Sequence, residues 1–277
     1  SIKCRSFITK RFQILEKWLN KKMNVNKQLI AIKDRIDKRS KDSRSSYLKK
    51  VKFSSEQTKS ARKNMGCSNI AHAFASCDKA QQDQGANGGS VIGIVSAYND
   101  MLSAHAPLKD YPDIIKKSSE KRDAIARVAG GVPAMCDGIT QGEPGMELSL
   151  FSRDVIALST AVAFSHNVFD AGICLGVCDK IVPGLVIGAL SFGHLPIAML
   201  TAGPMPTGIS NEEKSNNRKK YASGEIDRSA LISSEQSAYH TSGTCTFYGT
   251  ANRPRRRSRS RRPPRRQRST RLRWPWY

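Results

Sequence analysis

The chain has 277 residues and a formal net charge of +23, a length sufficient for about two domains of ordinary size. The positive excess lies at the ends: residues 1–65 carry +15 and residues 253–277 carry +12, whereas residues 66–252 carry −4. This distribution excludes a uniformly basic protein, and seven cysteines in so long a chain do not indicate a secreted disulfide scaffold. We therefore expect a mildly acidic globular body with reduced thiols, in the cytoplasm.

The N-terminal region divides into two parts. Residues 1–22 contain many basic residues and one acidic residue, Glu16, and they precede the first methionine, Met23. We expect them to lie outside the fold as sequence upstream of a natural start. A weak mitochondrial presequence is the alternative. Residues 23–65 are expected to form a solvated helical region, because apolar residues recur there at loose helical intervals among Lys, Arg and Ser.

From about Val91 the apolar pattern predicts strands that alternate with helices. Short apolar runs typical of buried strands occupy residues 91–97, 171–178 and 196–203. The run 148–167 has helical spacing, and Pro183 suits the first turn of a helix over 184–192. These elements predict an α/β domain over 66–252, with a parallel sheet flanked by helices on both faces.

The last part of this body has a different pattern. Residues 210–237 are expected to form exposed helix and loop, and residues 239–252 a turn rich in Gly and Thr that carries one cysteine. The most apolar stretch of the chain, 181–203, is interrupted by Pro183, His194 and Pro196. It therefore lacks the ~20 uninterrupted apolar residues of a transmembrane helix, and we expect no membrane span.

The composition changes abruptly after Asn252. The body from 66 to 252 contains five Arg, and residues 253–277 contain twelve with no acidic residue and no apolar periodicity. We expect this Arg-rich tail to be disordered. Its simplest interpretation is a frame change in the coding sequence, which an intact Arg-rich exon in the mature message would contradict.

Two groups of polar residues follow predicted strands. Asp100 follows the first strand, and Cys178, Asp179 and Lys180 follow the second. Ligands of parallel α/β sheets collect outside the carboxyl ends of the strands. Asp100 and Asp179 could together hold a divalent cation, and a thiolate at Cys178 would be favoured near a helix N-terminus. Alternatively, Cys178 could be a small core residue, as buried cysteines usually are, and Lys180 could be a base or only an ion-pair partner.

The other cysteines show no zinc-finger spacing. Cys67 and Cys245 have no CxxC partner, yet well-separated cysteines can converge on one iron–sulfur cluster. Cys136 is a fourth candidate ligand, and we expect Cys4, Cys77 and Cys174 to be structural. From the residues alone, the chain is a cytosolic α/β protein that could hold a cysteine-ligated cluster.

Several long ordered runs carry a family resemblance. From about Met23 to Asn252 the chain resembles the dihydroxy-acid and sugar-acid dehydratases, and SFGHLP (191–196) and TFYGTAN (246–252) look like the phosphogluconate branch of that family. The runs that carry the resemblance are GCSNIAHAFASC (66–77), GIVSAYNDMLSAHAP (93–107), the segment 128–167, LGVCDKIVPGL (175–185), GALSFGHLP (188–196) and YHTSGTCTFYGTAN (239–252).

The resemblance implies a hydro-lyase that removes water from 6-phospho-D-gluconate to give 2-dehydro-3-deoxy-6-phosphogluconate. Cys178 and Cys245 match cluster-ligand positions, and Cys67 matches a third cysteine used in related members. The expected cofactor is a [4Fe–4S] cluster, with [2Fe–2S] as the alternative. Asp100, Asp179 and Lys180 align with Mg²⁺-binding positions, where the lysine can be carbamylated.

Family members are longer, and the resemblance places their catalytic serine base and a further acidic Mg²⁺ ligand in a C-terminal domain. We therefore expect the catalytic base to lie outside this match and the chain by itself to be inactive. The full-length family implies a homodimer. Two other functions stay open: a dehydratase of another sugar acid or dihydroxy acid, and nucleic-acid binding through the Arg-rich tail, with Trp274, Trp276 and Tyr277 stacking on bases.

Overall fold

A computed structural model describes residues 26–206 and 208–244, with the backbone alone at 58–61 and 63. The predictions for residues 1–22, Cys4, Cys245 and the tail 253–277 lie outside these described residues. The chain divides into two compact units, Ser1–Phe53 and Ser54–Tyr277.

The first described element is one long helix, α2 (Lys27–Asn64). It begins in the first unit, where its larger apolar side chains, such as Leu29, Ile36 and Leu48, are exposed. Over the described residues Lys27–Asn64, the predicted helical region is therefore a solvated helix. Two short helices follow, α3 (Cys67–Phe74) and α4 (Lys79–Ala86), and Asp78 caps α4 by accepting a hydrogen bond from Gln81 N at 2.9 Å.

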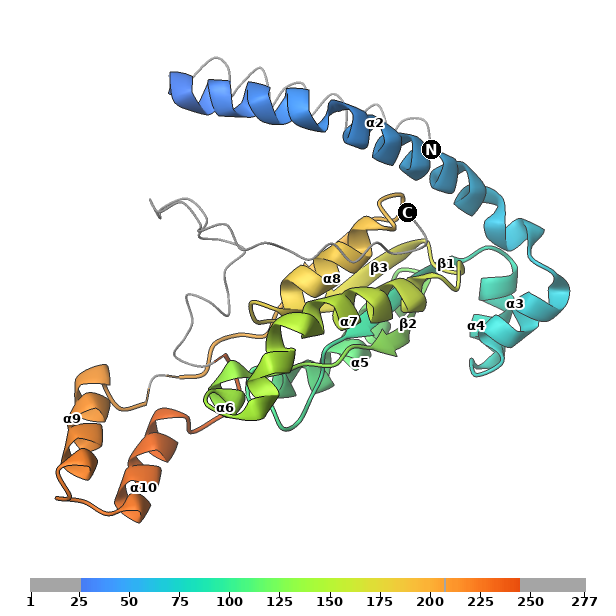
Figure 1. The fold of residues 1–277 in the computed structure, drawn as a ribbon. Coiled ribbons are helices and arrows are strands. Elements are labelled where there is room, and N and C mark those ends of the chain that lie inside the picture. Colours follow the sequence, from blue (N-terminus) through green and yellow to red (C-terminus); the bar gives the residue numbers. More distant parts are fainter. Residues whose placement is uncertain (1–25, 207, 245–277) are drawn as a thin grey trace. The chain divides into compact units, whose positions relative to one another are not determined.

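The second unit contains a four-stranded parallel sheet. Its strands are β1 (Ser90–Ser96), β2 (Ala124–Gly131), β3 (Ala171–Leu175) and β4 (Ile197–Leu200), in the order β2-β1-β3-β4. Helices flank the sheet (Figure 1), namely α5 (Tyr111–Glu120), α7 (Glu147–Phe164) and α8 (Ile181–Leu190). The predicted α/β class and the parallel sheet are confirmed.

Alternate residues of β1 enter two separate cores, as the two-residue period of a strand requires. Val91 and Val95 pack in a cluster with Ile156 and Phe164 of α7 and Leu185 of α8. On the other face, Ile94 packs with Leu108 of the short 3-10 helix η1 (Ala106–Lys109), next to Tyr111 and Ile115 of α5. Both faces of the central strands are therefore buried, which explains why β1 and β3 are continuous apolar runs.

Three sequence predictions need correction. Strand β2 has no counterpart among the strands predicted from the sequence. Strand β3 ends at Leu175, three residues before the predicted end. Cys178 adopts a φ of 80°, which extended backbone does not allow, so the strand cannot include it. Helix α8 spans Ile181–Leu190 instead of the predicted 184–192, and Pro183 lies in its first turn, as predicted.

After β4 the chain forms a hairpin of two helices, α9 (Asn211–Ala222) and α10 (Arg228–Ala238). This confirms the exposed helices expected over 210–237. Between β2 and α7 lie the short helices α6 (Asp137–Thr140) and η2 (Pro144–Met146). Within the described part of the chain, no helix combines the length and apolarity needed to cross a membrane.

Candidate functional site

The carboxyl ends of the parallel strands meet at one edge of the sheet. From β1 the chain crosses to β2 on one side, whereas β3 lies on the other side of β1. This reversal makes the gap between β1 and β3 the topological switch point, the usual ligand site of open α/β sheets. Asp100 follows β1, and Cys178, Asp179 and Lys180 follow β3, so the sequence prediction placed candidates on both sides of this point.

Lys180 is the centre of a charged cluster at this edge. Its side chain is only 9% exposed, and its Nζ contacts Asp137 Oδ2 and lies 3.3 Å from Asp179 Oδ2. Ser149 Oγ, from the first turn of α7, donates a hydrogen bond of 2.5 Å to Asp137 Oδ1. The buried ammonium is thus held by two carboxylates, one of which is itself oriented by a buried hydroxyl.

The surroundings of Lys180 also change its proton affinity. Burial lowers the pKa of the Lys180 ammonium, and the nearby Cys136 thiol group opposes this change. Cys136 is half-buried and is the residue before α6. The cluster therefore contains a sulfur group and an amine as well as carboxylates.

Cys178 is half-buried between the end of β3 and the first turn of α8. It packs against the main apolar core, and its carbonyl accepts a hydrogen bond from Val182 N at 3.2 Å. Cys174, in contrast, is fully buried in β3, and burial raises the pKa of its thiol to about 12. Such a thiol stays protonated, which suits the structural role expected for it.

His105 holds the loop that carries Asp100. Its ring is 1% exposed, and its Nδ1 lies 2.9 Å from Ala97 O, just beyond the end of β1. Burial lowers the pKa of His105 to about 4, so the ring is neutral and its Nδ1 donates to that carbonyl. Asp100, between these two residues, is exposed. No sequence motif singles out this histidine, because its role depends on its burial.

Cys67 and Cys245 were expected to join Cys178. Cys67 is exposed at the start of α3. The α3–α4 segment contacts β2 and the residue before it: Arg127 donates to Ala73 O, and Gln84 Nε2 donates to Asp123 O at 2.6 Å. Cys245 lies outside the described residues, but Thr244 before it is buried and pairs with Gly203 and Met205 beyond β4.

The structure therefore brings Asp179 and Lys180 together and places Asp100 at the same edge, without gathering Cys67 there. Within residues 26–206 and 208–244, no group of three or more His, Cys, Asp or Glu side chains is arranged to hold a metal ion. Sequence reasoning missed Asp137, because it follows β2, the strand that was not recognised. The rule that pointed to Asp100 and Asp179 would have found it once that strand was known.

These features define an α/β domain with a polar, thiol-containing site at the switch point of a parallel sheet. Residues 90–255 match the model of a family described as "Dihydroxy-acid/6-phosphogluconate dehydratase N-terminal". This match covers more than half of the chain, and the chain belongs to this family. The resemblance drawn from its sequence runs is thereby confirmed.

Individual relatives agree with the family match. Phosphogluconate dehydratase of Escherichia coli (strain K12) is 53% identical over 234 residues, which are 82% of this chain and 38% of that protein. Phosphogluconate dehydratase of Helicobacter pylori (strain 26695) is 55% identical over 222 residues, 80% of this chain and 36% of that protein. Dihydroxy-acid dehydratase of Akkermansia muciniphila is 33% identical over 168 residues, 58% of this chain and 30% of that protein. The chain thus spans less than two-fifths of the length of these relatives.

Proposed function

We propose that this chain provides part of the active site of a phosphogluconate dehydratase, which removes water from 6-phospho-D-gluconate. The observation that carries the proposal is the position of Asp100, Asp179 and Lys180 at the switch point, inside a region that is 53% identical to a protein of that name. Identity to the dihydroxy-acid dehydratase is 33%, which favours the phosphogluconate branch. A place in the Entner–Doudoroff pathway and in the cytoplasm belongs to the same proposal.

Asp100, Asp179 and Lys180 would hold the Mg²⁺ ion. Both aspartates are exposed and offer the oxygen ligands that Mg²⁺ prefers. Lys180 fits only after a change, because an ammonium paired with Asp137 has no lone pair to give. Carbamylation, as the resemblance implies, would replace that charge with oxygen donors. When bound, Mg²⁺ would hold the carboxylate and C2 oxygen of the substrate and make the C2 proton more acidic.

Cys178 and Cys245 would hold the iron–sulfur cluster, with Cys67 as the third ligand. Cys178 fits this role by its half-buried place at the site, and Cys245 directly follows a residue that is anchored beyond β4. Cys67 has less support, since α3 contacts β2. Cys136, close to Lys180, is the alternative third thiol. When bound, the cluster would supply a Lewis acid for the departing C3 hydroxyl.

The described residues themselves hold the proposed ligands in position. His105 fixes the loop of Asp100 against β1, and Asp137 with Ser149 fixes Lys180. The resemblance assigns proton abstraction to a serine in a C-terminal domain, beyond the region that the relatives share with this chain. We therefore expect the 277-residue chain alone to bind cofactor without turnover.

Anaerobic reconstitution of the full chain, followed by iron and sulfide analysis and a visible spectrum, tests the cluster. We expect a brown protein whose iron content falls in Cys178→Ser and in Cys245→Ser. Cys77→Ser is the matched control, because this half-buried thiol lies between α3 and α4 and is not a proposed ligand. Comparing Cys67→Ser with Cys136→Ser identifies the third ligand. Normal iron content in both Cys178→Ser and Cys245→Ser would refute the assignment.

The two alternatives have less support. A dehydratase of another sugar acid would share the cluster residues, so competition between 6-phospho-D-gluconate and unphosphorylated gluconate for the chain distinguishes it. Nucleic-acid binding would depend on residues 253–277, which lie outside the described part of the chain. Deleting these residues would abolish it, and neither the family nor the relatives favour it.

A further inference from the structure

The hairpin α9–α10 leaves the fold after β4, at the edge of the sheet that carries the candidate site, and rejoins it at Thr244. Its two ends are joined, because Pro204 and Thr244 form a bridge and Met205 N donates to Thr244 O at 2.9 Å. Gly243 N also donates to Ser103 O at 2.7 Å. Ser103 belongs to the loop between Asp100 and His105, so the base of the hairpin touches the segment that carries a proposed metal ligand.

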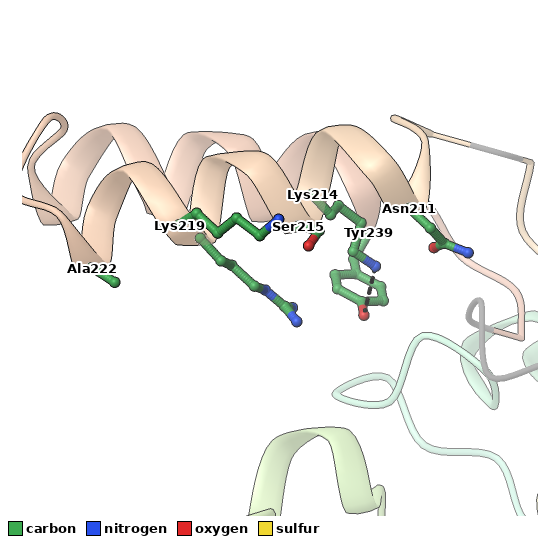
Figure 2. A pocket seen from close by; sticks show the side chains of 7 residues that line it. Asn211, Lys214, Ser215, Lys219, Ala222 and Tyr239 are labelled. Carbon is green, nitrogen blue, oxygen red and sulfur yellow. Dashed lines mark hydrogen bonds between the residues drawn. The ribbon is translucent and has the colours of Figure 1, made fainter.

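One face of α9 and the residue after α10 line a cavity of about 520 Å³, which we call the basic pocket. Figure 2 shows Asn211, Lys214, Ser215 and Lys219 on the same side of α9, with Tyr239 against Lys214. Arg218 also lines the pocket. These positions are three, four, seven and eight residues apart, the spacing that puts side chains on one face of a helix.

The basic pocket has a strong excess of positive charge. Three of its lining residues, Lys214, Arg218 and Lys219, are cations, and no lining residue is acidic. The carboxylate that faces the pocket cations is Glu235 of α10, which accepts a hydrogen bond of 2.6 Å from Arg218 Nε. Because a guanidinium has five N–H groups, this pair leaves Arg218 with further donors.

Lys214 is held in place more firmly than a surface lysine. The residue is only 8% exposed, its Nζ lies 4.7 Å from the centre of the Tyr239 ring, and it donates a hydrogen bond of 3.3 Å to Tyr239 Oη. Asn217 and Ser234 join the two helices beside it, at 2.7 Å. A fixed ammonium with neighbouring hydroxyl, amide and guanidinium donors is the arrangement that binds a phosphate group.

We propose that the basic pocket binds the phosphate monoester of the substrate, through Lys214, Lys219 and Arg218. The inference deepens the proposed function and rests on it. The phosphate of 6-phosphogluconate is at C6, whereas water is lost from C2 and C3, so a separate anion site beside the metal site is required. A hairpin whose base contacts the Asp100 loop provides such a site at the same edge of the sheet.

Calorimetric titration of the metal-free full chain with inorganic phosphate, 6-phospho-D-gluconate and D-gluconate tests this assignment. The key pair of variants is Lys219→Gln and Lys220→Gln. Both lysines are exposed neighbours on α9, but only Lys219 lines the pocket. The change in net charge is therefore the same in both variants, and so is any phosphate binding by the Arg-rich tail.

We expect both phosphate compounds to bind about tenfold more weakly to Lys219→Gln, the effect of one lost charge-assisted hydrogen bond. Lys220→Gln should bind them as the unchanged chain does, and D-gluconate should show no dependence on either lysine. Lys214→Gln should weaken binding at least as much, with far-UV circular dichroism as the check on folding. Equal phosphate affinities in Lys219→Gln, Lys220→Gln and the unchanged chain would overturn the inference.

This experiment is independent of the cluster. Phosphate binding that depends on Lys219 in a chain that takes up no iron would uphold the basic pocket and defeat the proposed dehydratase. Iron uptake that depends on Cys178, without any phosphate binding at Lys219, would uphold the proposed dehydratase and overturn the basic pocket.

Discussion

The central strands and the α9–α10 hairpin are stabilised in different ways. In β1, Val91, Ile94 and Val95 are fully buried between two apolar cores. In the hairpin, the described buried residues are Lys214 and Ala238, and the helices are joined by polar pairs such as Arg218 with Glu235. Burial of apolar area stabilises the first region by far more than exposed ion pairs stabilise the second.

The difference shows where this fold can accommodate function. The sheet fixes the positions of Asp100 and Lys180 but tolerates little change at its core. The hairpin has little buried apolar surface, so its charged residues are available to a ligand. Substitutions in the two regions should therefore differ in size, in pH dependence and in salt dependence.

The largest loss of stability is expected for Phe164→Ala. Phe164 is 1% exposed in the main core, with ring centroids 6.1 Å from Phe169 and 5.8 Å from Phe192. Removing it should lower the free energy of unfolding by about 3–5 kcal/mol, measured by urea denaturation. Phe151→Ala on the same helix is the control. Phe151 is 52% exposed, so its replacement should lower the free energy of unfolding by about 0.5 kcal/mol or less. Similar losses in both variants would contradict the described core.

His105 should make stability depend on pH. Its pKa falls from 6.5 to about 4 in the folded chain, so the unfolded state binds the proton first as pH decreases. The stabilisation is complete above pH 6.5 and is lost as the pH falls towards 4, by about 3 kcal/mol.

Urea denaturation at pH 7 and pH 4 measures this dependence. His105→Asn should be less stable at pH 7 but should lose less stability on acidification than the unchanged chain. His166→Asn, at the exposed end of α7, serves as the control for replacing a histidine. An unchanged pH dependence in His105→Asn would show that another group is responsible.

Asp137→Asn should have an intermediate effect. It removes a carboxylate from the buried Lys180 ammonium, which keeps only Asp179 at 3.3 Å. We expect a loss of about 2 kcal/mol in urea denaturation at pH 7, because a buried charge loses a partner. Asp113→Asn breaks an exposed pair with Lys116 at 3.1 Å and should change stability by about 0.5 kcal/mol or less. A loss no greater than in this control would mean that Asp137 does not hold Lys180.

Arg218→Gln should have the smallest effect on stability, about 0.5 kcal/mol. Hydrogen bonding to Arg218 lowers the pKa of Glu235, so the pair stabilises the hairpin only while Glu235 is ionised. The contribution should be present at neutral pH and should disappear in acid and at high salt. Lys220→Gln, on the same helix, is the control. A loss that persists at high salt would indicate packing by Arg218 instead of an ion pair.

Much of the sheet could be predicted from the sequence, but one strand could not. The runs that became β1 and β3 are apolar throughout, because both faces of these strands are covered. Strand β2 reads AIARVAGG, and its small residues face helix α7 closely: a Cβ on Gly130 would lie 3.2 Å from Ala163 Cβ. The need for a small residue at this position comes from a neighbour more than thirty residues away in the sequence. The local strand propensity is therefore low, and it did not reveal the strand.

The candidate site was predictable in the same uneven way. Asp100, Asp179 and Lys180 follow recognisable strands, and the rule on carboxyl ends located them. Asp137 and His105 were not identified, since one follows the unrecognised strand and the other matters only because it is buried.

The sequence by itself determined the α/β class, the alternation of strands and helices, and the family, because these depend on local apolar periodicity and on long runs of identity. Tertiary structure alone decided which strands are neighbours, that Lys180 is held by Asp137, and that cations of α9 line a pocket with Tyr239. These features join residues distant in the chain. Their energies come from burial and from the approach of charges in space, which no local pattern of residues records.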